Sequence, residues 1–253
     1  MLCIGADWLH SAASTGSSNK QPVVHAVVEA FELGQSAGTA LAEVLWGDTN
    51  PSGALPFTIY PEDFVDQVAM QDFSMRSGPG RTYRFYQGKA LWPFGFGLSY
   101  TSWNVAVGVP ATVRASTQDA ALDGLRFNVR VTNVGSVAGA RVLHAFVSEA
   151  SGTDGPLHDD VVRSRRPVLT LWGLGRTPQL TPNEAATLAL ATNDHSACAL
   201  CTVNSTGVRA VRAGTYTLRF GGDGGRGHSC GSAGAPCAEV QLVLSGATVV
   251  LPW

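Results

Sequence analysis

The stretch LRFNVRVTNVG, residues 125–135, decides the fold of this chain. Apolar and polar side chains alternate along it, and this period of two is typical of a strand with one buried and one exposed face. Asn133 and Gly135 then follow as turn residues. The apolar positions are Leu125, Phe127, Val129 and Val131, and the polar positions are Arg126, Asn128, Arg130 and Thr132.

The same alternation returns several times toward the C-terminus, each time bounded by Gly, Pro or Asn. Several short strands separated by turns predict an antiparallel β-sandwich of the immunoglobulin type over residues 104–253. The further strands are expected at Val142 to Val147, at Leu188 and Leu190, at Tyr216, Leu218 and Phe220, and at Val240, Leu242 and Leu244.

The first fifty residues have a different pattern. Residues 35–46 carry apolar side chains at helical spacing, and Gly47 and Pro51 end the predicted helix. Residues 2–6 read as a buried strand, whereas residues 23–31 fit either a helix or a buried strand. The stripe of the helix consists of Ala37, Ala40, Leu41, Val44 and Leu45.

Residues 50–103 are rich in proline, glycine and aromatic side chains. Each aromatic ring buries a large area when it packs. The high number of aromatic side chains therefore predicts a packed segment rather than a disordered linker. We therefore expect a long irregular segment that its rings clamp to a neighbouring domain.

Composition excludes several classes of function. Charged residues make up only 14% of the 253, and 17 Lys and Arg against 19 Asp and Glu leave a net charge of −2. A basic footprint for nucleic acid is therefore absent, and so is a polybasic patch for a membrane surface. No apolar run reaches the ~20 residues that a membrane helix needs.

Four of the five cysteines fall in the last quarter of the chain: Cys198, Cys201, Cys230 and Cys237. With His195 and His228 they could bind zinc, but their spacing fits the paired C-x-x-C pattern poorly. Disulfides formed in an oxidising compartment are the favoured reading, with the pairing open. Asn204 begins an Asn-x-Thr glycosylation pattern. We predict no metal site.

Motifs of common enzyme chemistry are missing. The sequence has no G-x-S-x-G and no H-E-x-x-H, and the glycine-rich GGDGGRG at 221–227 lacks the Lys-Ser/Thr ending of a phosphate loop. That stretch reads as the tip of a hairpin, and no cofactor is predicted. Paired carboxylates, as in glycoside hydrolysis, remain open, although any single acid is expected at the surface.

Two long motifs carry a family resemblance. GQSAGTALAEVLWGDTNPSGALPFTIYP (34–61) and PGRTYRFYQGKALWPFGFGLSYTSW (79–103) resemble the C-terminal part of glycoside hydrolase family 3. MQDFSMR (70–76) followed by PGRTYRFY resembles the β-xylosidase branch of that family rather than the β-glucosidase branch.

Residues 104–253 are similar to the fibronectin type III-like domain that closes many members of the family. The matching stretches are VTNVGSVAG (131–139), GLGR (173–176), PNE (182–184) and AGTY (213–216). The resemblance implies a mainly β chain with three parts: a truncated α/β sandwich remnant (1–60), an aromatic-rich connecting segment (61–103) and a fibronectin type III-like β-sandwich (104–253).

The chain departs from the family at the catalytic residues. Family members resemble retaining glycosidases, with a nucleophilic Asp on an N-terminal (β/α)8 barrel and an acid/base Glu upstream of the region matched here. Neither carboxylate can be transferred to a position in this sequence. The resemblance thus implies the C-terminal portion of a β-xylosidase-like enzyme, as a fragment or a subunit that needs a catalytic barrel to bind and cleave xylan-type carbohydrate.

Met75, Arg76 and Tyr83 are the candidate substrate-binding residues that the resemblance suggests. Arg76 could donate a hydrogen bond to a sugar hydroxyl, and the other two could pack on the ring. The alternative is an ion-pair role for Arg76 and a packing role for Tyr83.

Two other functions stay open on the sequence: a non-catalytic carbohydrate-binding or scaffold β-sandwich, and an adhesion domain. A sugar-binding sandwich needs outward-facing aromatic side chains, for which Trp172 is the candidate. Residues 1–50 are expected to expose an apolar patch that supports self-association or a partner subunit. The resemblance and the cysteines point to the extracellular space or the secretory pathway.

Overall fold

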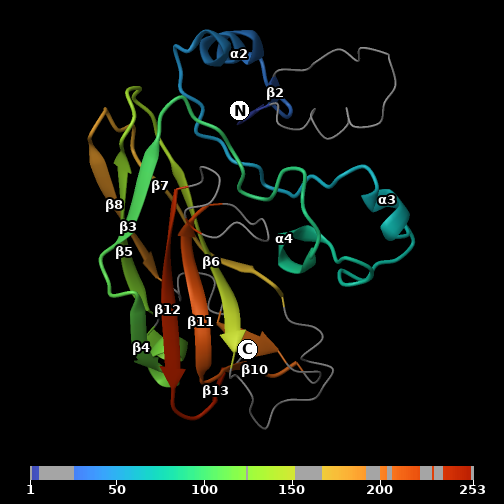
Figure 1. Ribbon diagram of the computed structural model, residues 1–253, viewed down its shortest axis with the longest axis vertical. Helices are drawn as coiled ribbons and strands as arrows, with labels where there is room; N and C mark the ends of the chain where they lie inside the picture. The colour runs from blue at the N-terminus through green and yellow to red at the C-terminus, as the bar shows by residue number, and fades with distance from the viewer. Residues whose placement is uncertain are drawn as a thin grey trace.

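The computed structural model describes residues 2–5, 26–123, 125–151, 167–191, 200–203, 207–222, 230 and 236–251. Within them the chain is mainly β, and its two largest sheets pack face to face as a β-sandwich (Figure 1). The predicted fold class is confirmed. The domain limits at residues 60 and 103 stay predictions.

The larger sheet of the sandwich has the strand order β4-β12-β11-β6-β7. All neighbours pair antiparallel except β12 and β4, which run parallel. Its strands are β4 (Thr112–Ser116), β6 (Val142–Ser151), β7 (Thr170–Arg176), β11 (Gly214–Gly221) and β12 (Cys237–Ser245).

The smaller sheet has the order β3-β5-β8, with both neighbours of β5 antiparallel to it. Strands β3, β5 and β8 share this sheet, while β6, β11 and β12 share the other, as strands A, B and E and strands C, F and G do in the immunoglobulin arrangement. The strands of the smaller sheet are β3 (Trp103–Val107), β5 (Arg126–Asn133) and β8 (Ala185–Ala191).

Short elements complete the sandwich. A third sheet has the order β13-β10-β9, and a π-helical turn, η1 (Asp119–Asp123), follows β4. The strands of this sheet are β9 (Cys201–Val203), β10 (Arg209–Val211) and β13 (Val249–Leu251).

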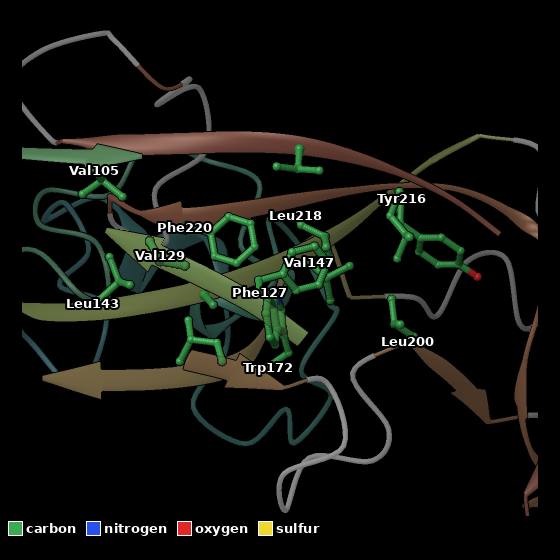
Figure 2. Close-up of a cluster of buried hydrophobic side chains, with 14 of the residues drawn as sticks. Val105, Phe127, Val129, Leu143, Val147, Trp172, Leu200, Tyr216, Leu218 and Phe220 are labelled. Carbon is green, nitrogen blue, oxygen red and sulfur yellow. The ribbon is translucent and has the colours of Figure 1, made fainter. Parts of the chain in front are cut away.

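The core lies between the two main sheets. Strand β5 alternates as its sequence predicts, with Phe127, Val129 and Val131 at 0–2% exposure. Phe127, Trp172 and Phe220 meet there with ring centroids 5.3 to 5.8 Å apart (Figure 2). Because tilted and edge-to-face ring pairs add to the burial of apolar area, this triad is a strong contributor to the stability of the sandwich.

The N-terminal elements are short. The strands β1 (Leu2–Gly5) and β2 (Ala26–Glu29) form a two-stranded antiparallel sheet, so the open choice for residues 23–31 resolves as a strand at residues 26–29. Helix α2 (Ala37–Trp46) ends at Gly47, whose φ of 88° is easily reached only by glycine. Two further single-turn helices are α3 (Phe64–Gln67) and α4 (Thr82–Phe85).

This N-terminal part has little core of its own. Among the described residues, its hydrophobic cluster is centred on the buried Leu55. The partly buried side chains that pack against Leu55 are Val27, Ile59, Trp92 and Phe96. Of the stripe predicted for α2, only Val44 is buried, and Leu45 is 58% exposed. The helix therefore contributes less burial than its sequence pattern indicates.

Asn50 ties this part to the sandwich. Its Nδ2 donates to the carbonyl of Ala138 at 3.2 Å, and its Oδ1 accepts from Ser99 Oγ at 3.0 Å and from the N–H of Tyr100 at 2.9 Å. Gly139 lies directly against the Asn50 amide, leaving no room there for a Cβ. One side chain thus joins three segments that are far apart in the sequence.

Aromatic rings form the second attachment. Phe94 stacks on Tyr83, and both rings approach Phe146 on the outer face of β6 at 6.0 to 6.1 Å. The buried His144 stands beside Phe146 and meets the edge of Phe94 at 5.5 Å. The clamp expected from the aromatic-rich segment is therefore present, and its contact surface is strand β6.

Candidate functional site

The predicted substrate-binding residues Met75 and Arg76 lie in the loop 69–81, which joins α3 to α4. Asp72 organises the first half of the loop, because its Oδ1 accepts from the N–H of Ser74 at 2.8 Å and its own N–H donates to the Ala69 carbonyl at 3.1 Å. Hydrogen bonds from the Ser77 side chain and from the Ser74 backbone lower the pKa of Asp72. The carboxylate form therefore holds this turn.

Arg81 closes the second half of the loop. Its guanidinium Nη2 donates to the carbonyl of Ala69 at 3.0 Å, and its N–H donates to the carbonyl of Met75 at 2.8 Å. The two ends of the loop are thereby joined by one side chain. The result is a hydrogen-bonded loop in which residues 73–76 are exposed.

Arg76 is placed by an aromatic ring. Its guanidinium carbon lies 4.3 Å from the centroid of Phe85, and that of Arg84 lies 5.7 Å from the same centroid. This is cation–π geometry, which holds the guanidinium over the face of the ring. Met75, the neighbour of Arg76, is 38% exposed.

Tyr83, unlike the other two candidates, packs against other aromatic rings. Its ring stacks on Phe94 with centroids 4.4 Å apart and meets the edge of Phe146, and the residue is half-buried. The structure therefore brings Met75 and Arg76 together on one loop and places Tyr83 in the clamp against β6. This position favours the packing role that the sequence left open.

Two exposed side chains of the loop were not singled out from the sequence. Met70 is 87% exposed and Phe73 is 90% exposed. The signal that could have identified them is the absence of any apolar periodicity in MQDFSMR, which leaves its apolar residues without a predicted buried face. The loop that carries Arg76 thus also exposes two large apolar side chains.

A disulfide joins Cys230 to Cys237, with the two Cα atoms 5.1 Å apart. Cys201 opens strand β9 and is half-buried, whereas Cys198 and the glycosylation candidate Asn204 lie outside the described residues. Within the described residues, no three His, Cys, Asp or Glu side chains gather in a way that could hold a metal ion.

Among the helices that the structure describes, none combines the length and the apolar character required to cross a bilayer.

Comparisons with known proteins identify the family. Residues 9–100 match the model of the glycosyl hydrolase family 3 C-terminal domain. The chain is 32% identical over 221 residues to Beta-D-xylosidase 1 of Arabidopsis thaliana, covering 81% of this chain and 28% of that relative. It is 34% identical over 211 residues to a probable exo-1,4-beta-xylosidase of Aspergillus fumigatus, covering 78% of this chain and 26% of the relative.

Solved structures give the same fold. A family 3 exo-beta-xylosidase, solved in complex with a xylobiose aziridine probe, matches 85% of this chain with a TM-score of 0.67 at 22% identity. The family 3 beta-glucosidase of Bifidobacterium adolescentis matches 86% with a TM-score of 0.62 at 25% identity. The match covers 27% and 30% of those chains, so the chain spans less than a third of the proteins it resembles.

The mainly β fold and the match to residues 9–100 place the chain among glycoside hydrolases. It belongs to glycoside hydrolase family 3, where it corresponds to the C-terminal part and is related to β-xylosidases. The resemblance predicted from residues 34–103 is thereby confirmed.

Proposed function

We propose that this chain is the supporting C-terminal portion of a β-xylosidase-type glycoside hydrolase that acts in the breakdown of xylan or a related carbohydrate. The observation that carries the proposal is the 221-residue similarity to Beta-D-xylosidase 1, at 32% identity. Because the chain spans 28% of that relative, the hydrolytic activity is proposed for the assembled enzyme rather than for these residues alone.

The family resemblance leads us to expect both catalytic carboxylates outside this chain. A retaining glycosidase needs one carboxyl group with a raised pKa as general acid and a second as nucleophile, about 5–5.5 Å away. The pKa values of Asp72 and Glu184 are instead lowered, because hydrogen bonds stabilise their charged forms, and both groups stabilise turns.

The loop 69–81 is the part of this chain that we expect to reach the sugar. Its hydrogen-bonded ends fix the backbone, and Phe85 holds the Arg76 guanidinium at 4.3 Å. A positioned guanidinium can donate to sugar hydroxyls, while Met75 supplies apolar contact beside it. In this role the loop binds and orients substrate and takes no part in bond cleavage.

The alternative of a carbohydrate-binding sandwich depends on Trp172. A sugar platform requires an exposed ring, but Trp172 is only 2% exposed and packs against Phe127 and Phe220 in the core. Its position favours the first proposal.

We also propose that the chain works outside the cell or in the secretory pathway. The support is the Cys230–Cys237 disulfide, since structural disulfides persist mainly in oxidising compartments. Mass spectrometry of the natively isolated protein before and after reduction tests this, and a reduced pair would contradict it.

The activity test begins with the full chain and an aryl β-xyloside. We expect no hydrolysis above the buffer rate, and measurable turnover by the chain alone would overturn the division of labour proposed here. In a chimera that replaces the matching C-terminal part of the Arabidopsis relative by this chain, hydrolysis is expected to return. There, Arg76→Ala should raise KM more than it lowers kcat, while the exposed Arg114→Ala on β4 serves as the matched control.

A further inference from the structure

The last turn of α2 carries an uncovered apolar surface. Trp46 is 79% exposed, Leu45 58% and Tyr100 43%. Tyr100 lies beside the helix because its Oη donates to the carbonyl of Val44 at 2.7 Å. Three large exposed apolar side chains thus lie on the end of α2 and on the segment that is hydrogen-bonded to it. We call Leu45, Trp46 and Tyr100 the helix face.

The sequence around the helix face is strongly acidic. Residues 26–66 contain seven carboxylates and no Lys or Arg, so the rest of the chain holds all 17 basic residues against 12 acidic ones. Glu43 and Asp48, which flank the exposed turn of α2, are themselves exposed. Among the described residues no ion pair reaches these carboxylates, which are Glu29, Glu32, Glu43, Asp48, Glu62, Asp63 and Asp66.

The outer face of the smaller sheet has the opposite charge. Arg126 and Arg130 point outward from β5, both are exposed, and within the described residues neither forms an ion pair. They are about 13 Å apart along the strand. Their neighbours across the sheet are small, since Arg130 stands opposite Ala106 and Thr187. The outward positions of β3, β5 and β8 carry no acidic residue. We call Arg126, Arg130 and these small neighbours the sheet face.

We propose that the helix face of one copy of this chain docks on the sheet face of a second copy. The apolar side chains of α2 would cover the small residues of β3 and β8, with Glu43 and Asp48 directed at the two arginines. Charge complementarity selects this pairing, because a symmetric pairing of two helix faces would bring like charges together. Figure 1 shows α2 at the top of the molecule and β8, β3 and β5 along its left side.

The two faces are different, so the contact is heterologous and leaves one face of each kind free in a dimer. Association therefore continues to longer head-to-tail assemblies as concentration rises. This inference stands on the surface of the chain itself and does not depend on the proposed hydrolase role.

Sedimentation velocity of the full chain over a wide concentration range is the test. We expect a weight-average sedimentation coefficient that rises with concentration and falls between 0.1 M and 1 M NaCl, because the screening length drops from about 10 Å to about 3 Å. A purely apolar contact would strengthen with salt instead. A chain that stays monomeric at all concentrations overturns the proposal.

Two variants separate the faces. Trp46→Ser and Arg126→Glu/Arg130→Glu should each weaken self-association about tenfold or more. Matched controls change an equally exposed ring or charge elsewhere: Phe73→Ser, in the loop 69–81, and Arg114→Glu, on β4, should sediment as the wild type. Circular dichroism confirms that each variant is folded, as expected for exposed positions.

Mixing the two variants is decisive. The Trp46→Ser chain keeps its sheet face and the arginine variant keeps its helix face, so an equimolar mixture should form a one-to-one dimer that grows no further. If the arginine variant alone still self-associates, or if mixing restores nothing, the head-to-tail contact is wrong. The first result would indicate a symmetric contact through α2, and the second a contact through some other surface.

Discussion

The β-sandwich and the N-terminal part are stabilised in different ways. The sandwich encloses one continuous cluster of buried side chains from both of its sheets, whereas the N-terminal part has Leu55 and a few partly buried neighbours. What holds the N-terminal part is its attachment to the sandwich, through Asn50 and through the rings that meet β6. The comparison teaches that a segment with a small core can depend for its packing on the outer surface of a larger sheet.

The largest effect is expected from breaking the sandwich core. Phe127→Ala removes a ring that is 2% exposed and contacts both Trp172 and Phe220. We expect a loss of about 3–5 kcal/mol in the free energy of unfolding, measured by urea denaturation, because the cavity cannot collapse between two packed sheets. The control Val134→Ala, at a 52% exposed position, should change it by less than about 1 kcal/mol.

A smaller and local effect is expected at the attachment. Asn50→Ala removes hydrogen bonds to Ala138, Ser99 and Tyr100, some of them in half-buried surroundings. We expect backbone amides of residues 26–60 to lose hydrogen-exchange protection by about 2 kcal/mol, while those of β5 and β11 keep theirs. Equal loss in both regions would mean that the N-terminal part and the sandwich unfold as one unit.

The ring clamp should contribute less than Asn50. Tyr83→Ala removes the stacking on Phe94 and the edge contact with Phe146, and we expect a local loss of about 1 kcal/mol in residues 79–96, measured by hydrogen exchange. Tyr83→Phe keeps both ring contacts and should behave as the wild type. If Tyr83→Phe loses protection as well, the hydroxyl rather than the ring holds the segment.

The sandwich was predictable because its signal is local. The period of two along β5 and β11 specifies which side chains are buried, and Gly47 marks the end of α2 within one turn of the helix. The role of Asn50 was not predictable, since its partners lie 49 to 88 residues away and an Asn near a turn normally serves that turn.

The candidate site also contains a part that the sequence predicts and a part that depends on contacts distant in the sequence. Met75 and Arg76 are adjacent in the sequence and share a loop, so a motif was sufficient to group them. Tyr83 belongs to the same motif, but its surroundings depend on Phe146, which reaches it from strand β6 of the sandwich. The cation–π contact of Arg76 with Phe85 depends on the turn at α4, which no periodicity indicates.

The smallest effects are expected at two carboxylates that hold turns, one in each region. In the turn before β8, Oε2 of Glu184 accepts from the N–H and the hydroxyl of Thr181 at 2.8 and 2.9 Å, and these bonds lower its pKa below the ordinary 4.5. A lowered folded-state pKa gives stability that is present above the unfolded value and is lost as pH falls through the folded value. The unfolding free energies of the wild type and Glu184→Gln should therefore differ at neutral pH and converge below pH 4.5.

Asp72 has the same sign of shift but lies in the loop 69–81. Asp72→Asn should therefore loosen that loop in hydrogen exchange at neutral pH, with the difference from the wild type vanishing in acid below its ordinary pKa of 3.8. Because the loop belongs to the part without a large core, urea unfolding of the sandwich should be unchanged in this variant, in contrast to Glu184→Gln. A change in the urea midpoint for Asp72→Asn would show that the loop and the sandwich share one cooperative transition, and the distinction between the two regions would then fail.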